Sequence, residues 1–468
     1  MMEIVKFSVF ALKRRKGMEF LGRQDNVKDM TIGSPVKLLL EFSVPLMIGN
    51  VFQEMYTFFD TMIVGRQLGI TGLAAMGVAE CISFMMFNFV QGITQGFAVV
   101  VSQNFGQGDK KRFRESVCNA YFLAIICAIL FTSAGIPLLK PMLQILQTPV
   151  EIFDMAHAYL YVLFLGIPVT IGYNILAAIL RAVGNSKKPL VAVIISSVSN
   201  IIMDIIFVVI LRVGIVGAAF STVIAQMLSM IYCLYVMKAN GVLRLDKENR
   251  KMNAGIMKFQ IFMGFPMGLQ SFLMTVGNIA VHIAVNCLGI AVIAGYAGYT
   301  KIILILETAG LSYGYAISTF TAQNKGAGKK ERVKAGFMAA MKIGTITAFA
   351  MALIMIFGGK YILRLLISET GENGLNAVEM GFQCLFVTAL FFPLLYYLFI
   401  IRSSIQGMGD SLFPMIASFI QSVVRIVCAF VLTKAVGYDG VVWSSVLAWI
   451  GSDIYLMIVF FYRYRKWI

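Results

Sequence analysis

The chain has 468 residues, of which 59% are hydrophobic and 13% are charged, and its mean hydropathy is +0.83. Soluble domains carry about 45–50% apolar and about 25% charged residues, so the composition excludes a large soluble protein and indicates a polytopic membrane protein. The formal net charge of +16 would suggest nucleic acid as a partner of a soluble chain, but the basic residues lie between apolar segments, so we expect positive-inside topology and no nucleic-acid binding.

The first 34 residues indicate a cytoplasmic tail rather than a secretion signal. A short apolar run, Val5 to Leu12, comes before the basic cluster Lys13–Lys16, which reverses the order found in a signal peptide. The seven cysteines fall within apolar stretches without a Cys-x-x-Cys spacing, and the two histidines show no zinc-type spacing. We therefore predict no disulfide framework, no zinc site and no cofactor.

Twelve apolar segments are long enough to cross a bilayer, whose core of about 30 Å needs about 20 residues in a helix. Their centres lie near residues 51, 89, 125, 168, 200, 226, 272, 307, 346, 389, 423 and 450. Two intervals between them, Ile136–Asp154 and Lys360–Glu379, are amphipathic and are expected at the outer surface. The expected fold is an all-α polytopic membrane protein.

The basic residues predict the orientation of these segments. If both termini are cytoplasmic, 30 of the 39 Lys and Arg residues fall on the inner side, six on the outer side and three within the segments. Cytoplasmic loops of membrane proteins carry an excess of Lys and Arg. The distribution therefore predicts a multi-pass protein with both termini in the cytoplasm.

An internal repeat divides the chain into two halves. The stretch Ser102-Gln-Asn-Phe-Gly-Gln-Gly-Asp-Lys-Lys-Arg112 recurs as Ala322-Gln-Asn-Lys-Gly-Ala-Gly-Lys-Lys-Glu-Arg332. Further matches follow in the same order, including Gly184-Asn-Ser-x-x-Pro189 with Gly409-Asp-Ser-x-x-Pro414. Because each half holds six segments, both halves share one orientation. We predict two six-helix lobes related by a pseudo-two-fold axis along the membrane normal.

This repeat sets the predicted boundaries of the chain's parts. They are a tail over 1–34, an N-lobe over 35–239, a cytoplasmic linker over 240–255, a C-lobe over 256–462 and a C-terminal tail over 463–468. The Gly-x-Gly of the repeated motif follows an apolar helix rather than a strand, and no P-loop Gly-Lys-Ser/Thr occurs. We therefore expect no ATP-driven transport unless a separate subunit supplies it.

The most informative polar residue is Asp60, in the first apolar segment. Gln53, Tyr56 and Asp60 are spaced i, i+3 and i+7, so they share one face of a helix. A carboxylate in the middle of a membrane helix costs roughly 2.5–3.5 kcal/mol on insertion scales and marks a functional site by default. The aligned position in the second half holds Ala280 or Val281, so the fold itself does not require the acid.

A second acid, Asp204, lies in the fifth segment, four residues after Asn200 and on the same helix face. Its aligned position in the second half is also apolar. Together with Asp60 and Thr222, these residues offer an all-oxygen set that suits sodium, or a proton shared between two carboxylates. Burial and mutual repulsion favour the protonated form of one acid, so sodium ions and protons would compete for the site.

Other charged residues within the segments have no assigned role. Glu54 and Glu80 fit equally well in a central cavity or near a membrane interface. Arg425 and Asp453 are expected to pair across the eleventh and twelfth segments, and Lys301 fits as an offsetting charge in the C-lobe.

The sequence resembles that of the multidrug and toxic compound extrusion (MATE) transporters. The resemblance rests on Phe59-Asp-Thr-Met-Ile-Val-Gly65, the repeated Gln-Asn-x-Gly-x-Gly-x-Lys, Arg181-Ala-Val-Gly-Asn185 and Asn200-Ile-Ile-Met-Asp204, and it extends from about residue 35 to 462. It implies an antiporter of the bacterial inner membrane that exports small amphipathic organic cations in exchange for H⁺ or Na⁺ by alternating access. The family likeness also favours a monomer.

The family's functional positions are carried over onto this sequence residue by residue. Its cation site, which would hold Na⁺ if coupling is to sodium, resembles Asp60, Asn200, Asp204 and Thr222, and its substrate cavity resembles Gln53, Tyr56, Tyr159 and Asn174. Pro45, fifteen residues before Asp60, is similar to the proline whose kink the family is thought to use in switching. The seventh segment has no acid, and Lys301 stands with Ile303 where an Arg-Ile-Glu run is common. This departure favours coupling in the first lobe, as in the DinF-like branch.

Three other functions stay open. A lipid-linked saccharide flippase of a related superfamily fold would need a strongly cationic cavity, whereas only Lys301, Lys342 and Arg425 lie within the segments. An ion channel suits a two-lobe repeat less well than alternating access does, and a membrane-embedded enzyme would need a cluster of His, Cys or Asp that the sequence lacks. The sequence does not distinguish which drugs are carried, which ion drives them, the stoichiometry or the oligomeric state.

Overall fold

The computed structural model describes residues 27–239, 243, 251–367 and 371–464. Their regular secondary structure is entirely helical, as predicted. Residues 1–26 of the predicted tail, most of the predicted linker 240–255 and the end of the C-terminal tail 463–468 lie outside the described residues. The boundaries proposed for the lobes therefore stay predictions.

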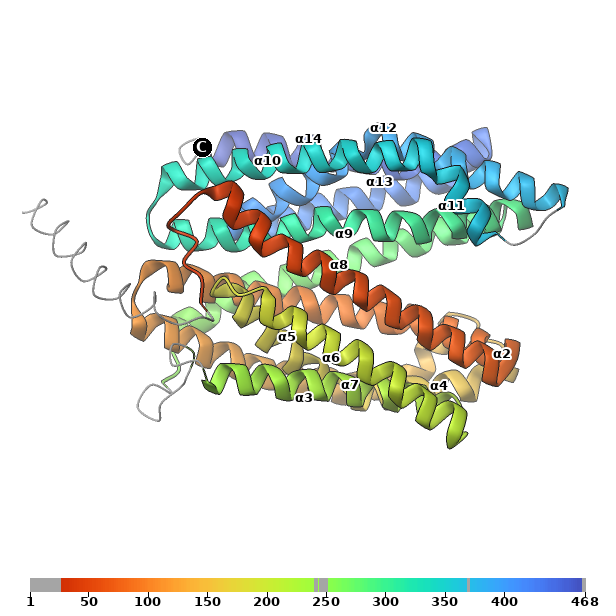
Figure 1. Ribbon diagram of the computed structural model, residues 1–468, viewed down its shortest axis with the longest axis horizontal. Helices are drawn as coiled ribbons and strands as arrows, with labels where there is room; N and C mark the ends of the chain where they lie inside the picture. The colour runs from red at the N-terminus through yellow and green to blue at the C-terminus, as the bar shows by residue number, and fades with distance from the viewer. Residues whose placement is uncertain (1–26, 240–242, 244–250, 368–370, 465–468) are drawn as a thin grey trace, which may run out of the picture. The chain divides into compact units, whose positions relative to one another are not determined.

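The helices follow one another along the chain, and two of them, η1 and η3, are π-helical (Figure 1). In order, they are α2 (Pro35–Gln107), α3 (Lys110–Ile145), α4 (Val150–Leu165), α5 (Ile167–Ala182), α6 (Lys187–Asp204), η1 (Ile205–Ile210), α7 (Ile215–Ala239), α8 (Ala254–Asn286), α9 (Ile290–Gly326), α10 (Lys330–Leu353), η3 (Ile354–Gly358), α11 (Gly359–Leu366), α12 (Glu372–Gly407), α13 (Leu412–Val436) and α14 (Tyr438–Tyr464). Among the described residues, ten helical stretches are individually long and apolar enough to cross a membrane.

These ten stretches are consistent with the twelve predicted spans, because α2 is long enough for two spans and the bent pair α4 and α5 supplies one more. Helix α2 covers 73 residues, which is about 110 Å at 1.5 Å per residue and enough for two crossings. It breaks at Gly69, whose φ of +67° is a conformation that glycine adopts readily and other residues do not. Helices α4 and α5 are bent by 48° relative to each other at Gly166 and together form one further span.

The two amphipathic intervals between spans are largely helical. Helix α3 passes through Pro137 and Pro141 and ends only at Ile145, so the first half of the interval 136–154 extends a span. In the second half of the chain, η3 and α11 continue α10 in the same way, and Leu363 of α11 is fully buried. Apolar residues spaced for burial keep these extensions helical beyond the predicted segment ends.

The chain forms two compact units. Unit 1 comprises Ile48–Gly268, Ala322–Lys329 and the described residues before Gly33, and unit 2 comprises Gly33–Met47, Leu269–Thr321 and the described part of Lys330–Ile468. Within unit 1, α7 packs against α4, α5 and α6, and within unit 2, α14 packs against α12 and α13. The last two helices of each half are therefore neighbours in both units, as two matching halves predict.

The two copies of the repeated motif contact each other within unit 1. A Cβ atom on Gly106, near the end of α2, would overlap the main-chain carbonyl oxygen of Gln323, and a Cβ on Gly326, at the end of α9, would overlap that of Gln103. The contact is therefore reciprocal. Only glycine allows two backbones to approach this closely, so this glycine is a packing requirement in both copies.

A short segment before α2 also belongs to this contact. Lys28 donates its main-chain N–H to the carbonyl of Val183 at 2.9 Å, and Met30 donates its N–H to the Gln323 side chain at 2.8 Å. The Asn324 side chain donates to the Met30 carbonyl at 3.1 Å, and Met30 has no exposed surface. The described end of the predicted tail is thus packed into unit 1.

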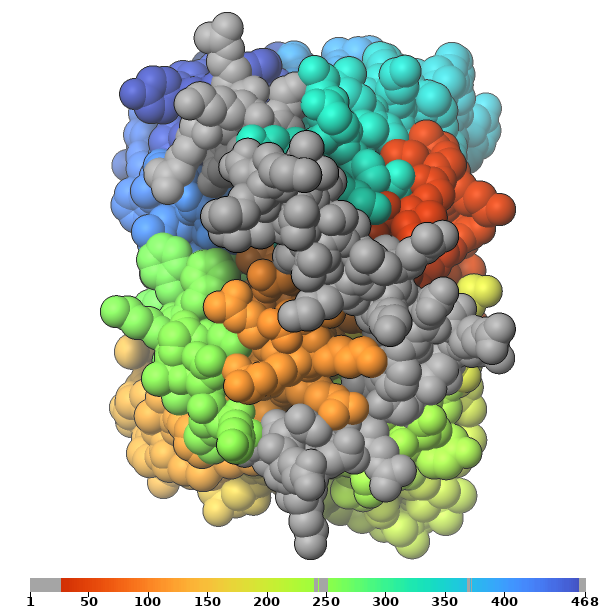
Figure 2. Space-filling view, turned by 90° about the vertical axis from the view of Figure 1, so that its left-hand side faces the viewer, coloured from red at the N-terminus to blue at the C-terminus, as the bar shows by residue number. Residues whose placement is uncertain are grey.

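The turn from α2 to α3 is joined to the start of α8. Asn119 of α3 donates to the carbonyl of Asn253 at 2.8 Å, and the Asn253 side chain donates to the Glu115 carboxylate at 2.9 Å. Figure 2 shows this face of unit 1, with the α2–α3 turn in orange and the start of α8 in green. The basic residues within Lys110–Arg114, predicted to be cytoplasmic, begin α3 directly after this turn.

We predict that Gly106→Ala and Gly326→Ala each destabilise the purified protein by roughly 1–3 kcal/mol, the usual effect of overpacking. A main-chain carbonyl cannot rotate aside as a side chain can, so the backbones must separate. Gly77→Ala is the matched control, because Gly77 is also helical in α2 but a Cβ there meets nothing within 4 Å. Unfolding midpoints measured by scanning fluorimetry that are equal for all three variants would contradict the reciprocal contact.

Candidate cation-binding site

Two buried carboxylates from different helices form the centre of the candidate site in unit 1. Asp60 lies on α2 and is 4% exposed, and Asp204 is the last residue of α6 and has no exposed surface. The two carboxyl groups interact directly with each other. The structure therefore brings together the two acids that the sequence analysis singled out.

Helix geometry changes directly after Asp204. The following residues, Ile205–Ile210, form the π-helical η1, in which Leu211 donates its N–H to the carbonyl of Ile206 at 2.8 Å, five residues back. Such π-helical turns are rare and occur frequently at functional sites. The sequence analysis missed this feature because an apolar run fits an α-helix equally well.

Asn200 and Thr222 join the acids through the packing of α6 against α7. Asn200 donates from Nδ2 to the Thr222 hydroxyl at 3.4 Å, and that hydroxyl donates to the carbonyl of Ala218 at 3.2 Å. Both side chains are buried. Asn200 and Asp204 share one face of α6 because they are one turn apart, so the predicted set Asp60, Asn200, Asp204 and Thr222 lies within one unit.

Four buried oxygen atoms of this set have no hydrogen-bond donor within the described part of the chain. They are Oδ1 of Asp60, Oδ1 of Asn200 and both carboxylate oxygens of Asp204. A buried acceptor without a donor costs about 1–3 kcal/mol, and an uncompensated buried anion costs more. Among the described residues, the groups that act on the charge of the two acids are each other, Glu80 and Ser221, and none of these is cationic. The oxygen set therefore fits a small cation or a proton.

Two tyrosines and a third acid lie beside the pair. Tyr159 of α4 is buried and interacts with Asp60, Asp204 and Glu80, and Tyr56 of α2 interacts with Asp60 and Asp204. The sequence analysis left Glu80 undecided because it lies beyond the Gly69 break, where the pattern does not show which face turns toward Asp60. The three acids are not a metal-holding cluster, and no such group of His, Cys, Asp or Glu occurs in the described residues.

Ser221 is a further member that the sequence analysis missed. It is fully buried on α7, donates to the carbonyl of Gly217 at 3.0 Å and interacts with Asp204. Ser221 matches Ser444 in the second half of the repeat. The acids stood out because the aligned positions in the second half are apolar. Ser221 aligns with another serine, so the same comparison did not single it out.

The other predicted positions are not drawn into the cluster. Gln53 of α2 is exposed, and Asn174 of α5 is partly buried and donates to the carbonyl of Thr170 on its own helix at 2.9 Å. Among the described contacts, neither side chain touches Asp60 or Asp204. Pro45 lies inside α2, as predicted.

Unit 2 carries a buried acid of a different kind. Asp453 of α14 is 3% exposed, and the buried guanidinium of Arg402 on α12 interacts with it as a counter-charge. The expected pair of Asp453 with Arg425 was wrong, since Arg425 donates instead to the side-chain oxygen of Asn278 on α8. The packing of α12 against α14 brings Arg402 to the acid. Asp453 thus has a basic neighbour, whereas the acids of unit 1 have each other.

Comparison with known proteins identifies the family. A family model described as MatE matches residues 45–206 and 266–431, one stretch in each half of the repeat. The probable multidrug resistance protein YpnP of Bacillus subtilis (strain 168) is 30% identical over 446 residues, which cover 94% of this chain and 97% of that protein. The multidrug export protein MepA of Staphylococcus aureus (strain MRSA252) is 25% identical, with coverage of 89% and 91%.

Solved structures share the fold along nearly the whole chain. The crystal structure of MATE in complex with MaL6 has a TM-score of 0.87 at 20% identity and covers 95% of this chain and 98% of that one. A MOP superfamily transporter from Pyrococcus furiosus, described as having a binding pocket of reverse polarity, has a TM-score of 0.86 with the same identity and coverage. The family match and the 30% identical relative together show that this chain belongs to the MatE family of membrane transporters and is not an enzyme.

Proposed function

We propose that this transporter is a secondary active efflux antiporter, which exports small amphipathic organic cations in exchange for H⁺ or Na⁺ by alternating access. It would act as a monomer in a bacterial inner membrane with both termini cytoplasmic. The relatives YpnP and MepA are named multidrug resistance and export proteins, which supports efflux. The observation that carries the proposal is the set of four buried oxygens without donors at Asp60, Asn200 and Asp204.

Ion binding follows from the electrostatics of the carboxylate pair. Two ionised acids in a bundle repel each other, and no basic group in the described part of the chain interacts with either of them. A cation or proton between them is attracted by both charges in a medium that screens little. For Na⁺, the oxygens of Asn200 and Thr222 would complete an all-oxygen shell, the ligand type that hard cations prefer.

Exchange follows if the cargo and the coupling ion bind the same negatively charged carboxylates. The phenol rings of Tyr56 and Tyr159 lie beside the acids, and aromatic faces attract organic cations. Gln53 and Asn174 would add polar contacts farther along the cavity. Because an organic cation and a coupling ion both neutralise the carboxylates, binding of one disfavours binding of the other, as antiport requires.

The membrane potential sets the free energy that is available to drive export. Each positive charge that moves inward gains about 2.3 kcal/mol per 100 mV. One or two coupling ions per cycle therefore suffice for a useful concentration gradient of cargo. Two carboxylates can release at most two protons, or they can share one sodium ion.

We predict that Asp60→Asn and Asp204→Asn each abolish efflux of ethidium from proteoliposomes under an imposed Na⁺ or H⁺ gradient, applied separately. If the two acids hold one ion, the double variant loses no more than either single variant. The gradient that drives wild-type efflux identifies the coupling ion. Asp154→Asn is the control, because Asp154 is an exposed acid on α4. Undiminished efflux in either single variant would refute the proposal.

We also predict opposite effects of neutralising the buried acids on stability. Asp60→Asn and Asp204→Asn should leave the unfolding midpoint unchanged or raise it, because each removes an uncompensated anion. Asp453→Asn should lower the stability by roughly 1 kcal/mol, since it removes the negative charge that acts on the buried guanidinium of Arg402. Scanning fluorimetry of the three purified variants measures the contrast. A large loss for Asp204→Asn would assign that acid to the structure instead of to ion binding.

A further inference from the structure

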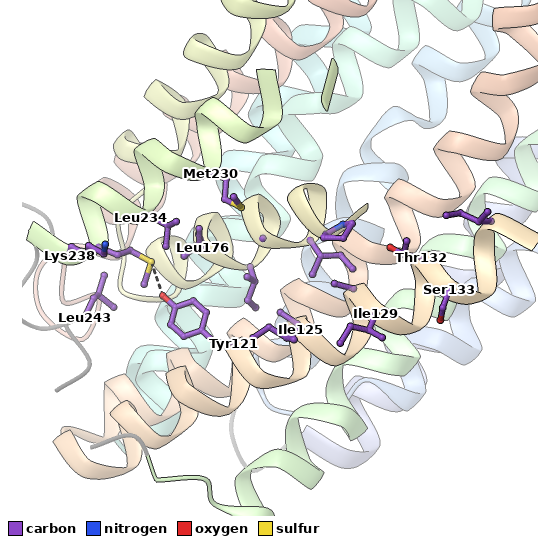
Figure 3. Close-up of a pocket in the computed structure, with 18 of the residues that line it drawn as sticks. Tyr121, Ile125, Ile129, Thr132, Ser133, Leu176, Met230, Leu234, Lys238 and Leu243 are labelled. Carbon is purple, nitrogen blue, oxygen red and sulfur yellow. Dashed lines mark hydrogen bonds between the residues drawn. The ribbon is translucent and has the colours of Figure 1, made fainter. Parts of the chain in front are cut away.

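Unit 1 contains a large groove that is separate from the candidate cation site. It has a volume of about 1500 Å³ and lies between α3, α5 and α7 (Figure 3). None of the predicted site residues lines it. Clefts that enclose drug-sized ligands measure about 300–1000 Å³, so the groove has room for a ligand larger than these.

The groove is elongated along the membrane-spanning helices. Its lining on α3 extends from Tyr121 to Pro137, which is about 24 Å at 1.5 Å per residue. The bilayer core is about 30 Å thick, so the groove is longer than one leaflet. A bound molecule could therefore lie parallel to the lipid chains over its full length.

The wall of the groove is almost entirely aliphatic. Ile125 and Ile129 of α3 are 59% and 65% exposed, and Met230 and Leu234 of α7 face them across the groove (Figure 3). Gly172 of α5 also lines it. Branched aliphatic side chains and a methionine accommodate flexible hydrocarbon chains without demanding one shape.

The polar groups lie at the two ends. Lys238, the basic residue in the last turn of α7, lies at one end beside Tyr121, whose hydroxyl donates to the sulfur of Met237 at 3.2 Å. Thr132 and Ser133 lie toward the other end, about one helical turn before Pro137 (Figure 3). Among the described residues that line the groove, Lys238 is the one charged side chain, and none of them is an acid. By the distribution of basic residues, the Lys238 end is the cytoplasmic one.

Two prolines help to shape this space. Pro137 lies within α3 and Pro168 in the first turn of α5, and both line the groove. Proline inside a helix removes a hydrogen bond and kinks the axis. The bend of 48° between α4 and α5 falls next to Pro168. Both prolines therefore contribute to the wall of the groove.

We propose that this groove binds one anionic phospholipid of the cytoplasmic leaflet, with its acyl chains along α3, α5 and α7 and its phosphate at Lys238. The described lining carries one positive charge and no negative one, which attracts an anionic headgroup and repels an organic cation. The aliphatic wall accepts the acyl chains. This site is independent of the proposed ion coupling, because it shares no residue with the acid cluster.

The test compares retained lipids. The full-length protein is reconstituted in vesicles of equal parts phosphatidylglycerol and phosphatidylcholine, released into detergent and examined by native mass spectrometry. We expect one retained phosphatidylglycerol. Lys238→Gln should lower the ratio of phosphatidylglycerol to phosphatidylcholine about fivefold, the effect of one basic residue on an anionic headgroup. Lys238→Arg should preserve the ratio.

Two further variants separate headgroup recognition from chain binding. Lys258→Gln removes an exposed basic residue in the first part of α8, outside the groove, and should leave the ratio unchanged. Ile125→Trp fills the groove from an exposed position and should reduce retention of both lipids. Equal retention of the two lipids by the wild type, or an unchanged ratio in Lys238→Gln, would overturn the proposal. Displacement of the lipid from the wild type by ethidium, with Ile125→Trp losing that ethidium binding, would assign the groove to cationic cargo and overturn it as well.

Discussion

The rest of this transporter depends on one constraint: two carboxylates are held away from water, and no basic side chain of the described residues interacts with them. Asp60 and Asp204 come from different helices, and apolar packing around them leaves no solvent to screen their repulsion. Desolvating an anion is expensive, and a second anion nearby adds to the expense. In the proposed function, a bound cation or proton offsets this energy. The bundle is therefore more stable when the site is occupied than when it is empty.

The same type of side chain serves a different end in unit 2. Asp453 is as deeply buried as Asp60, and its carboxylate oxygens likewise have no hydrogen-bond donor among the described residues, yet the positive charge of the buried Arg402 acts on it. A fixed counter-charge leaves no demand for an exchangeable one. The distinction between an ion-binding acid and a structural acid therefore lies in the charges around it and not in its burial.

Much of the fold could be predicted because membrane spans and their orientation depend on short stretches of sequence. Windows of about 20 apolar residues give the twelve spans, and the basic residues between them give the orientation. The break at Gly69 and the helical extension to Ile145 could not be predicted, since an apolar window does not show where a backbone bends. Asp60 was visible as an isolated charge in an apolar run. Whether Glu80 faces Asp60 depends on the rotation of the part of α2 that follows Gly69. The partner of Arg425 depends on which helices are neighbours. Both therefore required the packed structure.

The reciprocal contact between Gly106 and Gly326 has a consequence for how the two halves could diverge. Each glycine meets a main-chain carbonyl of the other copy, and no substitution can make a carbonyl smaller. A change at one position therefore has no compensating change at the other. The two halves differ in charge at Asp60 and its apolar counterpart, whereas the main-chain contact at Gly106 and Gly326 leaves room for a single residue type in both.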